Sequence, residues 1–538
     1  MAITNYIKEM KGKKYINGIE YTHPEYDKYS PLWSKARDIL MGETELKTLA
    51  KREKYLARLG GHAYDEEGNR DYKQFVEYAM LFNATGRTVE AYRGLLNRKS
   101  PIVDLPKEIE DLKSNFTIKG ESINTFLEQV ETEVITTNRV GIFIDYPYRD
   151  SGSPFTKADE KKYNFSPYAT MYPAESIINW EETRVNNKIV TSLVILREID
   201  YVRIDSFTPV AKTTYRVLEL DEYGYYRQII VEPVAITEGM NRGSANEIKK
   251  IVYPRKNGEK LTQIPFIPVT AQGVTWTLSK SIIEDLVNVN LAHYRDTAFY
   301  EKAIAWTASP TAVFSGLPDE AQEIAIGSSR GIIIAPGGTA KYLEYEGRGL
   351  DAIKEALDSK ENLMAVLGTK ILATTAGKAE SGEAALIHRA GEQGILSDVA
   401  TTIEGVAETA IKIIADWRGA KTNSITVHIN KDFSPIIMDA NTLIAMGKEL
   451  QAGNISHETY YWAMQRGELA SATRSLEEEL ALIKKGRKMV VSKSSPIYVN
   501  KKDAKIIEEA DEDIKKKAEV DAVVPNPLQI DATKQIEE

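Results

Sequence analysis

One short segment of the sequence matches a motif that holds a catalytic serine. Residues 327–331 read GSSRG, which fits the G-x-S-x-G pattern of a hydrolase nucleophile elbow with Ser329 as the nucleophile. That elbow works only between a buried strand and a following helix, whereas the next residues, GIIIAP, read as a strand. A turn of small residues entering a strand is therefore the simpler interpretation, and a serine hydrolase that uses a later histidine is the alternative.

Other reactive patterns are incomplete. APGGTAK lacks the Walker spacing between glycine and Lys341, and no serine or threonine follows that lysine. The six histidines show no paired ligand spacing, and HETYY at His457 lacks a second histidine one turn later. Because the chain has no cysteine, disulfides and thiolate ligands are excluded. We expect no metal, no cofactor and no enzymatic activity.

The elements that would hold these residues predict an α+β chain. Apolar periodicity favours helices between 30 and 130, and β-branched and aromatic residues favour an antiparallel β unit from 140 onward. Hairpin turns are predicted at Asn257 with Gly258 and at Tyr223 with Gly224. Helix returns at 279–306 and 349–372. The second of these helices has an apolar stripe formed by Leu350, Ile353, Leu357, Met364, Leu367 and Ile371.

A further helix is predicted over 396–417, and it has an unusually regular apolar seam. Two interpretations stay open: the helix packs inside its own chain, or it packs against neighbouring subunits. The seam is formed by Leu396, Val399, Ile403, Val406, Ala410, Ile413 and Trp417.

Composition narrows the classes of function. A hydrophobic fraction of 42% and a charged fraction of 27% are typical of globular chains. No apolar run reaches the roughly 18 to 20 residues that cross a bilayer, so we expect no membrane contact. The net charge of −9 predicts that any contact with DNA is light. The charge-dense end, residues 486–538, is expected to be a solvated helix and a tail of low order.

One resemblance is carried by the segments WSKARDILMG, YAMLFNATGRTVEAYRGLLNRKSP, GIFIDYP, YPAESIINW, LAHYRDTAFYEKAIAWTASPTAVFSG and LMAVLGTKIL. In their order and spacing, over roughly residues 33–469, these segments resemble the portal proteins of tailed bacteriophages. The resemblance implies the portal fold, whose parts would be a wing (1–275, helices then the β unit), a first stem helix (276–306), a clip (307–347), a second stem helix (348–368), a tunnel loop (369–382), a long helix with a wing or crown return (383–485) and a charged crown or tail (486–538).

The resemblance also implies a function. A ring of about twelve subunits would sit at one capsid vertex of the virion, after assembly in the host cytoplasm, and double-stranded DNA would be packaged and ejected through it. Implied partners are other copies of the chain, the DNA, the large terminase subunit, neck adaptor or head-completion proteins, and the major capsid and scaffolding proteins. Another ring-forming head-assembly or neck protein is the structural alternative.

The implied site residues fall in three groups. The tunnel loop would meet DNA through small polar residues and two lysines, although an ordinary surface loop would have the same composition. The clip would dock terminase and neck proteins, and the helix seam would contact neighbouring subunits. These residues are Lys370, Thr374, Thr375, Lys378 and Ser381 in the loop, Ser329, Arg330, Lys341 and Tyr342 in the clip, and Leu396, Val399, Ile403, Val406, Ile413 and Trp417 in the seam.

Overall fold

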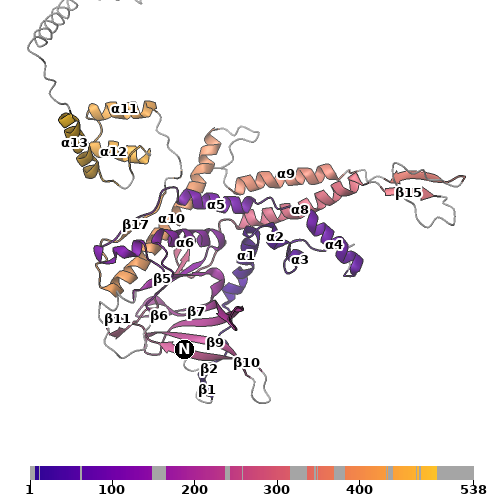
Figure 1. Cartoon of the computed structure of the whole chain (residues 1–538), viewed down its shortest axis with the longest axis horizontal. Helices are drawn as coiled ribbons and strands as arrows, with labels where there is room; N and C mark the ends of the chain where they lie inside the picture. The colour runs from indigo at the N-terminus through magenta and orange to yellow at the C-terminus, as the bar shows by residue number, and fades with distance from the viewer. Residues whose placement is uncertain are drawn as a thin grey trace, which may run out of the picture. The chain divides into compact units, whose positions relative to one another are not determined.

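The computed structural model divides the chain into two compact units, Met1–Phe433 and Ser434–Glu538. Helices and antiparallel sheets together give the predicted α+β class (Figure 1). The structure describes residues 7–10, 13–60, 64–147, 165–236, 243–256, 258–309, 311–315, 336–343, 347, 349–368, 382–431, 433, 440–467, 469–471 and 474–493.

The first unit contains the helices that were predicted between 30 and 130. Four of them begin at a polar side chain that accepts a hydrogen bond from a backbone N–H of the first turn, which satisfies one of the donors left open there. A strand, β3 (Ile102–Asp104), and a 3-10 helix (Lys107–Lys113) interrupt the helical stretch. The helices are α1 (Pro24–Leu40), α2 (Glu43–Leu46), α3 (Arg52–Tyr55), α4 (Glu66–Tyr78), α5 (Ala84–Leu96) and α6 (Ile123–Thr137).

A seven-stranded antiparallel sheet follows, in the order β1-β2-β10-β9-β8-β7-β6. The turn predicted at Gly224 joins β8 to β9, and its φ of 78° is one that glycine adopts freely. Two strands precede the helices in sequence yet belong to this sheet, because Ile16 of β2 pairs with Asn246 of β10. The strands are β1 (Ile7–Met10), β2 (Lys13–Ile16), β6 (Ile177–Val185), β7 (Lys188–Arg203), β8 (Pro209–Leu220), β9 (Tyr226–Ile236) and β10 (Gly243–Val252).

A second antiparallel sheet has four strands in the order β14-β13-β4-β5. All six residues of β4 are buried, which fits its continuous apolar sequence VGIFID. The hairpin predicted at Gly258 joins two short strands, while Asn257 lies outside the described residues. The strands of the four-stranded sheet are β4 (Val140–Asp145), β5 (Tyr168–Pro173), β13 (Phe266–Thr270) and β14 (Gly273–Val274). The hairpin strands are β11 (Arg255–Lys256) and β12 (Glu259–Lys260), and a further strand, β17 (Thr426–His428), pairs with β3.

A cluster of aromatic side chains packs with the apolar side chains of both sheets. The ring of Trp180 stacks on Trp276 at 5.5 Å between centroids and on His23 at 3.9 Å. The guanidinium of Arg139 lies 4.0 Å from the Trp180 centroid and is 3% exposed. Its two Nη atoms have no hydrogen-bond partner among the described residues, and burial lowers the pKa of Arg139 to about 9. The cation is therefore held by ring faces.

Helix α10 (Gly382–Arg418) covers the range predicted for the long helix and belongs to the larger apolar core. Four seam residues, Leu396, Val399, Ile403 and Val406, are 1% exposed or less, and Ile413 and Trp417 pack partly buried against the same cluster. The chain's own elements cover these four side chains, which favours an intramolecular core over a contact with a neighbouring subunit at this seam.

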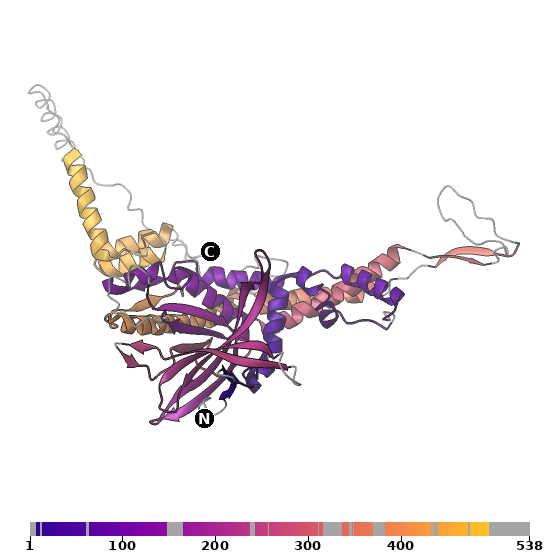
Figure 2. The same ribbon diagram turned by 60° about the horizontal axis from the view of Figure 1, so that its bottom comes forward.

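Two further helices and two strands lie between the sheets and α10 in sequence. α8 (Glu284–Ala308) and α9 (Leu350–Leu367) lie side by side, and β15 (Thr311–Ser315) pairs with β16 (Thr339–Leu343) beyond their ends (Figures 1 and 2). Both helices fall where the sequence predicted them. Thr307 and Ala308 of the expected clip form the end of α8; its other described residues contain no helix, and most of them form this two-stranded ribbon.

The second unit contains α11 (Ala440–Gln451), α12 (His457–Arg466) and α13 (Leu476–Lys493). Among the described residues of this unit, Ala463 is the apolar side chain that reaches full burial, at 7% exposed. Residues 494–538, most of the predicted charged tail, lie outside the described residues. No described helix of either unit has the length and apolar character needed to cross a bilayer.

Candidate functional site

Buried polar side chains fix the first half of α8 to the helices before it. The Oδ1 atom of Asn290 accepts hydrogen bonds from the backbone N–H of Thr85 at 3.1 Å and from its hydroxyl at 2.9 Å. Its Nδ2 atom donates to the carbonyl of Phe82 at 2.7 Å. Thr297 accepts a bond from the backbone N–H of Met80 at 3.1 Å. Because each bond replaces water on a buried group, these contacts hold the helix in one position.

The second half of α8 is covered much less. Beyond Ala298 no side chain of the helix is fully buried. Phe299 is 40% exposed, Ile304 37% and Trp306 58%. Side chains of this size on one helix end leave apolar area for another surface to cover.

α9 packs on α8 through the predicted stripe. Leu357 is 8% exposed and Met364 2%, while the last predicted member, Ile371, lies outside the described residues. Two polar contacts set the register of the pair. Lys360 forms an ion pair with Asp296, and Nε2 of the buried His293 lies 3.3 Å from a carboxylate oxygen of Glu361. The stripe buries one narrow side of α9 and leaves the rest to solvent.

The solvent side of α9 has an acidic stripe. Asp351, Glu355 and Asp358 follow one another at four and three residues, so their side chains share one face of the helix, opposite the apolar stripe. All three are exposed, and none forms an ion pair with a described residue. Like charges at this spacing cost each helix about 0.2–0.5 kcal/mol per pair. The exposed Lys354 lies three residues from Asp351 and four from Asp358 and offsets part of this repulsion, so the face, with three carboxylates and one ammonium, stays net negative.

The β15–β16 ribbon holds two of the four predicted clip residues. Lys341 pairs with Val313, and Tyr342 pairs with Ala312 and is 59% exposed. Every side chain of β16 is exposed. The ribbon is two-stranded among the described residues, and neither of its outer edges pairs with another described strand. Ser329 and Arg330 lie outside the described residues, so the hydrolase motif has no described geometry.

Of the predicted DNA-facing loop, 369–382, the structure describes Gly382 alone. Lys370, Thr374, Thr375, Lys378 and Ser381 all lie outside the described residues. Gly368 caps the C-terminal end of α9, and an added Cβ there would stand 2.6 Å from Oγ1 of Thr88 and 2.9 Å from the carbonyl oxygen of Met364. A larger residue at this position would have to displace α5 or α9, so the chain leaves α9 from a tightly packed point.

Residues 283–418 match a domain of unknown function (DUF4055). The match runs from the start of α8 to the end of α10. The DUF4055 region therefore contains the helix pair, the ribbon, the acidic stripe and the long core helix, as well as the residues predicted for the clip and the loop.

Two solved structures match more of the chain at low similarity. "Neck of native GTA particle computed with C12 symmetry" is 11% identical with a TM-score of 0.33, and covers 71% of this chain and 89% of that one. "Neck of empty GTA particle computed with C6 symmetry" is 10% identical with a TM-score of 0.36, and covers 74% and 94%. TM-scores below 0.5 do not establish a shared fold. No curated protein matches the chain.

Sequence reasoning missed the acidic stripe in the DUF4055 region. The spacing of Asp351, Glu355 and Asp358 is readable in the sequence, but only the apolar side of the same helix was interpreted. No group of metal-ligating side chains occurs within the described part of the chain. What the described geometry offers is a helix pair with exposed apolar side chains, an acidic stripe on α9 and an exposed ribbon.

Proposed function

We propose that this protein is the portal subunit of a tailed-phage-like particle, and that copies of the chain form a ring through which double-stranded DNA is packaged and ejected. The observation that carries the proposal is α9, which has one apolar side against α8 and an acidic stripe on the opposite side. In a closed ring the α8–α9 pairs would surround the passage with the stripes facing it. The DUF4055 match supports treating this region as one functional module.

The acidic stripe would limit the affinity of the ring for DNA. A wall that bound phosphates tightly would hold the DNA still, whereas carboxylates repel the backbone and permit sliding. Lys370 and Lys378 of the loop would supply sparse positive contacts that the ring repeats without reading bases. Binding of duplex DNA should then be weak and sensitive to salt.

Ring closure would use the apolar side chains that one chain leaves uncovered. Phe299 and Ile304 of α8 and Leu363 and Val366 of α9 are between 37% and 48% exposed. Head-to-tail contacts through such surfaces close into a ring when the rotation per subunit divides a full turn, and about twelve copies are proposed. The ribbon with Lys341 and Tyr342 would be the dock for terminase and neck adaptors, with capsid and scaffolding proteins around the ring.

The protein is proposed to have no catalytic activity of its own. Native mass spectrometry with end-on electron micrographs tests the main proposal: an annulus of about twelve copies with a central hole is expected. A monomer labelled at Ser329 by a serine-reactive probe would instead support a hydrolase. A ring of another size that retains no DNA would support another head-assembly or neck protein.

Replacement of residues 369–382 by a short linker tests the loop. Assembly should be unchanged, because α9 and α10 keep their own packing, while DNA packaging or retention should fall. Normal packaging by that variant would contradict the role given to the loop.

A further inference from the structure

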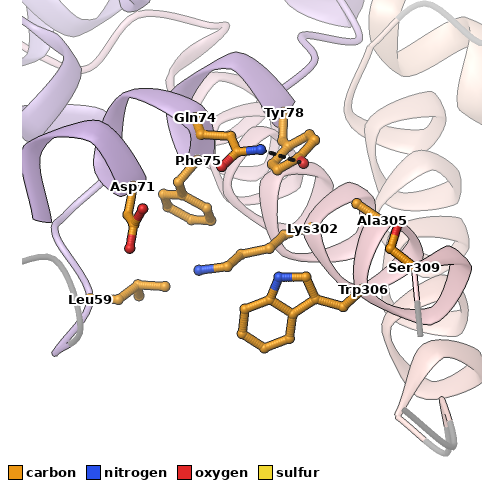
Figure 3. A pocket seen from close by; sticks show the side chains of 9 residues that line it. All are labelled: Leu59, Asp71, Gln74, Phe75, Tyr78, Lys302, Ala305, Trp306 and Ser309. Carbon is orange, nitrogen blue, oxygen red and sulfur yellow. Dashed lines mark hydrogen bonds between the residues drawn. The ribbon is translucent and has the colours of Figure 1, made fainter. Parts of the chain in front are cut away.

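A pocket of about 590 Å³ lies between α4 and the uncovered end of α8 (Figure 3). Leu59 and Trp306 form apolar walls of the pocket, and Phe75 forms its floor. Phe75 is 1% exposed and packs edge-on against Phe299, with 5.4 Å between the ring centroids, so the floor is preformed. Trp306 is 58% exposed on the open side. An exposed indole beside a fixed apolar floor is typical of a residue that anchors a partner.

The pocket has one charge of each sign. The ammonium of Lys302 lies 5.4 Å from the Phe75 ring and 5.0 Å from the Trp306 ring, and it has no ion pair with a described residue. Asp71 lines the same pocket, and Figure 3 shows its carboxylate and the Lys302 ammonium on the same side of it. A ligand that fits would therefore combine an aromatic or aliphatic side chain with a carboxylate and a cation.

The end of the β7–β8 hairpin has this combination of groups. Phe207 at the turn is 90% exposed, more than any other large apolar side chain in the described part of the chain. Arg203 and Asp205 lie within four residues of it and are exposed. Because Phe207 is exposed, it does not fill the pocket of its own chain.

The hairpin tip is also preorganised. One carboxylate oxygen of Asp205 accepts hydrogen bonds from the backbone N–H groups of Phe207 and Thr208, both at 2.8 Å, and the N–H of Ile204 bonds to the carbonyl of Thr208 at 3.1 Å. Little conformational entropy remains to be lost when such a tip binds. On either side of the tip Ile199, Tyr201 and Val210 are 41% to 76% exposed, so apolar area flanks the phenyl ring.

We propose that the pocket between α4 and α8 binds the β7–β8 tip of a second copy of this chain. Phe207 would enter between Trp306 and Phe75, with Asp205 toward Lys302 and Arg203 toward Asp71. The contact is head-to-tail, since tip and pocket are different surfaces, and therefore can propagate around a ring. The inference rests on the self-association in the proposed function and specifies one of its contacts.

Disulfide trapping tests the contact directly, because the chain has no native cysteine. Phe207→Cys and Ser309→Cys proteins, mixed and oxidised, should give a cross-linked dimer, and the double variant should give a ladder of multimers. Tyr223→Cys is the control matched in exposure, because Tyr223 is 76% exposed at the β8–β9 turn, at the opposite end of β8 from Phe207. It should form no disulfide with Ser309→Cys.

Exchanging the charges of Arg203 and Asp71 gives a second test, because a misfolded variant would not be rescued by the compensating substitution. Arg203→Glu should raise the subunit concentration needed for assembly by about tenfold, the size of a change at a moderately important interface residue. Asp71→Lys in the same chain should restore assembly, whereas restoration is not expected with Glu77→Lys outside the pocket.

The outcomes separate this inference from the proposed function. Rings that form without the Phe207–Ser309 cross-link, or with equal cross-linking of Tyr223→Cys, would overturn the contact and leave the ring intact. An absence of rings would overturn both. Cross-linking together with charge rescue would establish the contact.

Discussion

Two helices of the DUF4055 region, α10 and α9, differ in what covers them. The apolar seam of α10 is enclosed by its own chain, with Val399 1% exposed and Ile403 fully buried. α9 is covered along one stripe, and Val366 on another side is 48% exposed. Helices with similar periodic sequences can therefore differ in burial: α10 contributes its seam to the core of its own chain, and α9 leaves most of its surface exposed.

The largest expected change in the free energy of unfolding comes from a substitution in the seam of α10. Ile403→Ala removes a fully buried side chain from the larger core and leaves a cavity, so the free energy of unfolding should fall by about 3–4 kcal/mol. Urea unfolding followed by circular dichroism measures it. A loss below about 1 kcal/mol would mean that this seam is not a core of the single chain.

A smaller effect comes from Glu131, which lies on α6 in the same core region. Burial raises the pKa of Glu131 to about 7, while Asn97 donates a hydrogen bond to its carboxyl. The folded state thus binds this proton more tightly than the unfolded state, whose pKa is near 4.5. The stabilisation is complete below about pH 4.5 and is lost as the pH rises through about 7, a change of about 2–3 kcal/mol.

Glu131→Gln should remove that dependence and make the protein more stable at pH 8 than the wild type. Denaturant unfolding at pH 5, 6, 7 and 8 measures the slope. Glu128→Gln is the control on the same helix, because its side chain is exposed and its removal should leave most of the slope. Parallel pH profiles for wild type and Glu131→Gln would exclude Glu131 as the cause.

Removing charge from the acidic stripe of α9 tests the role proposed for its exposed face. Asp351→Asn with Glu355→Gln removes both like-charge pairs of the stripe, so unfolding should cost about 0.4–1 kcal/mol more. Assembled rings should bind duplex DNA more tightly at low salt, which a filter-binding titration across salt concentrations detects. Glu181→Gln with Glu182→Gln removes the same charge from exposed positions on β6 and should leave DNA binding unchanged. Equal gains in both variants would show that net charge alone decides the binding.

The smallest effect on a single chain is expected at Val366. Val366→Ala should change the free energy of unfolding by less than about 0.5 kcal/mol, because nearly half of the side chain already faces water. The same change should weaken assembly, which sedimentation at falling protein concentration detects. If the monomer lost as much stability as with Ile403→Ala, the contrast between the two helices would disappear.

Periodicity predicted the helices of the DUF4055 region because their apolar spacing is a local property of the sequence. α8 and α9 lie close to the expected ranges, and α10 covers the range predicted from its seam. The pairing of β2 with β10 was not predicted, since it joins segments far apart in the chain and no local signal specifies it. Asn290 looks like any polar helix residue until its partners in α5 and the preceding loop are placed beside it.

The candidate site was predicted in part. Lys341 and Tyr342 do lie on an exposed strand, whereas the acidic stripe was missed because a charged helix face usually means only solvent contact. The roles of the loop residues remain predictions, and so does docking at the clip. The tip of the β7–β8 hairpin could have been noticed from its apolar residues around a turn, but their exposure depends on where the neighbouring strands end.

The stack of Trp180 and Trp276 has an optical consequence. The two indoles are nearly parallel at 9° and 5.5 Å apart, so their electronic transitions couple and should give a distinctive ultraviolet circular dichroism band. Arg139 and His23 sit against the same ring and should quench its emission. The joint between the two sheets thus has its own spectroscopic signature, which lets its loosening be followed separately from the melting of α10.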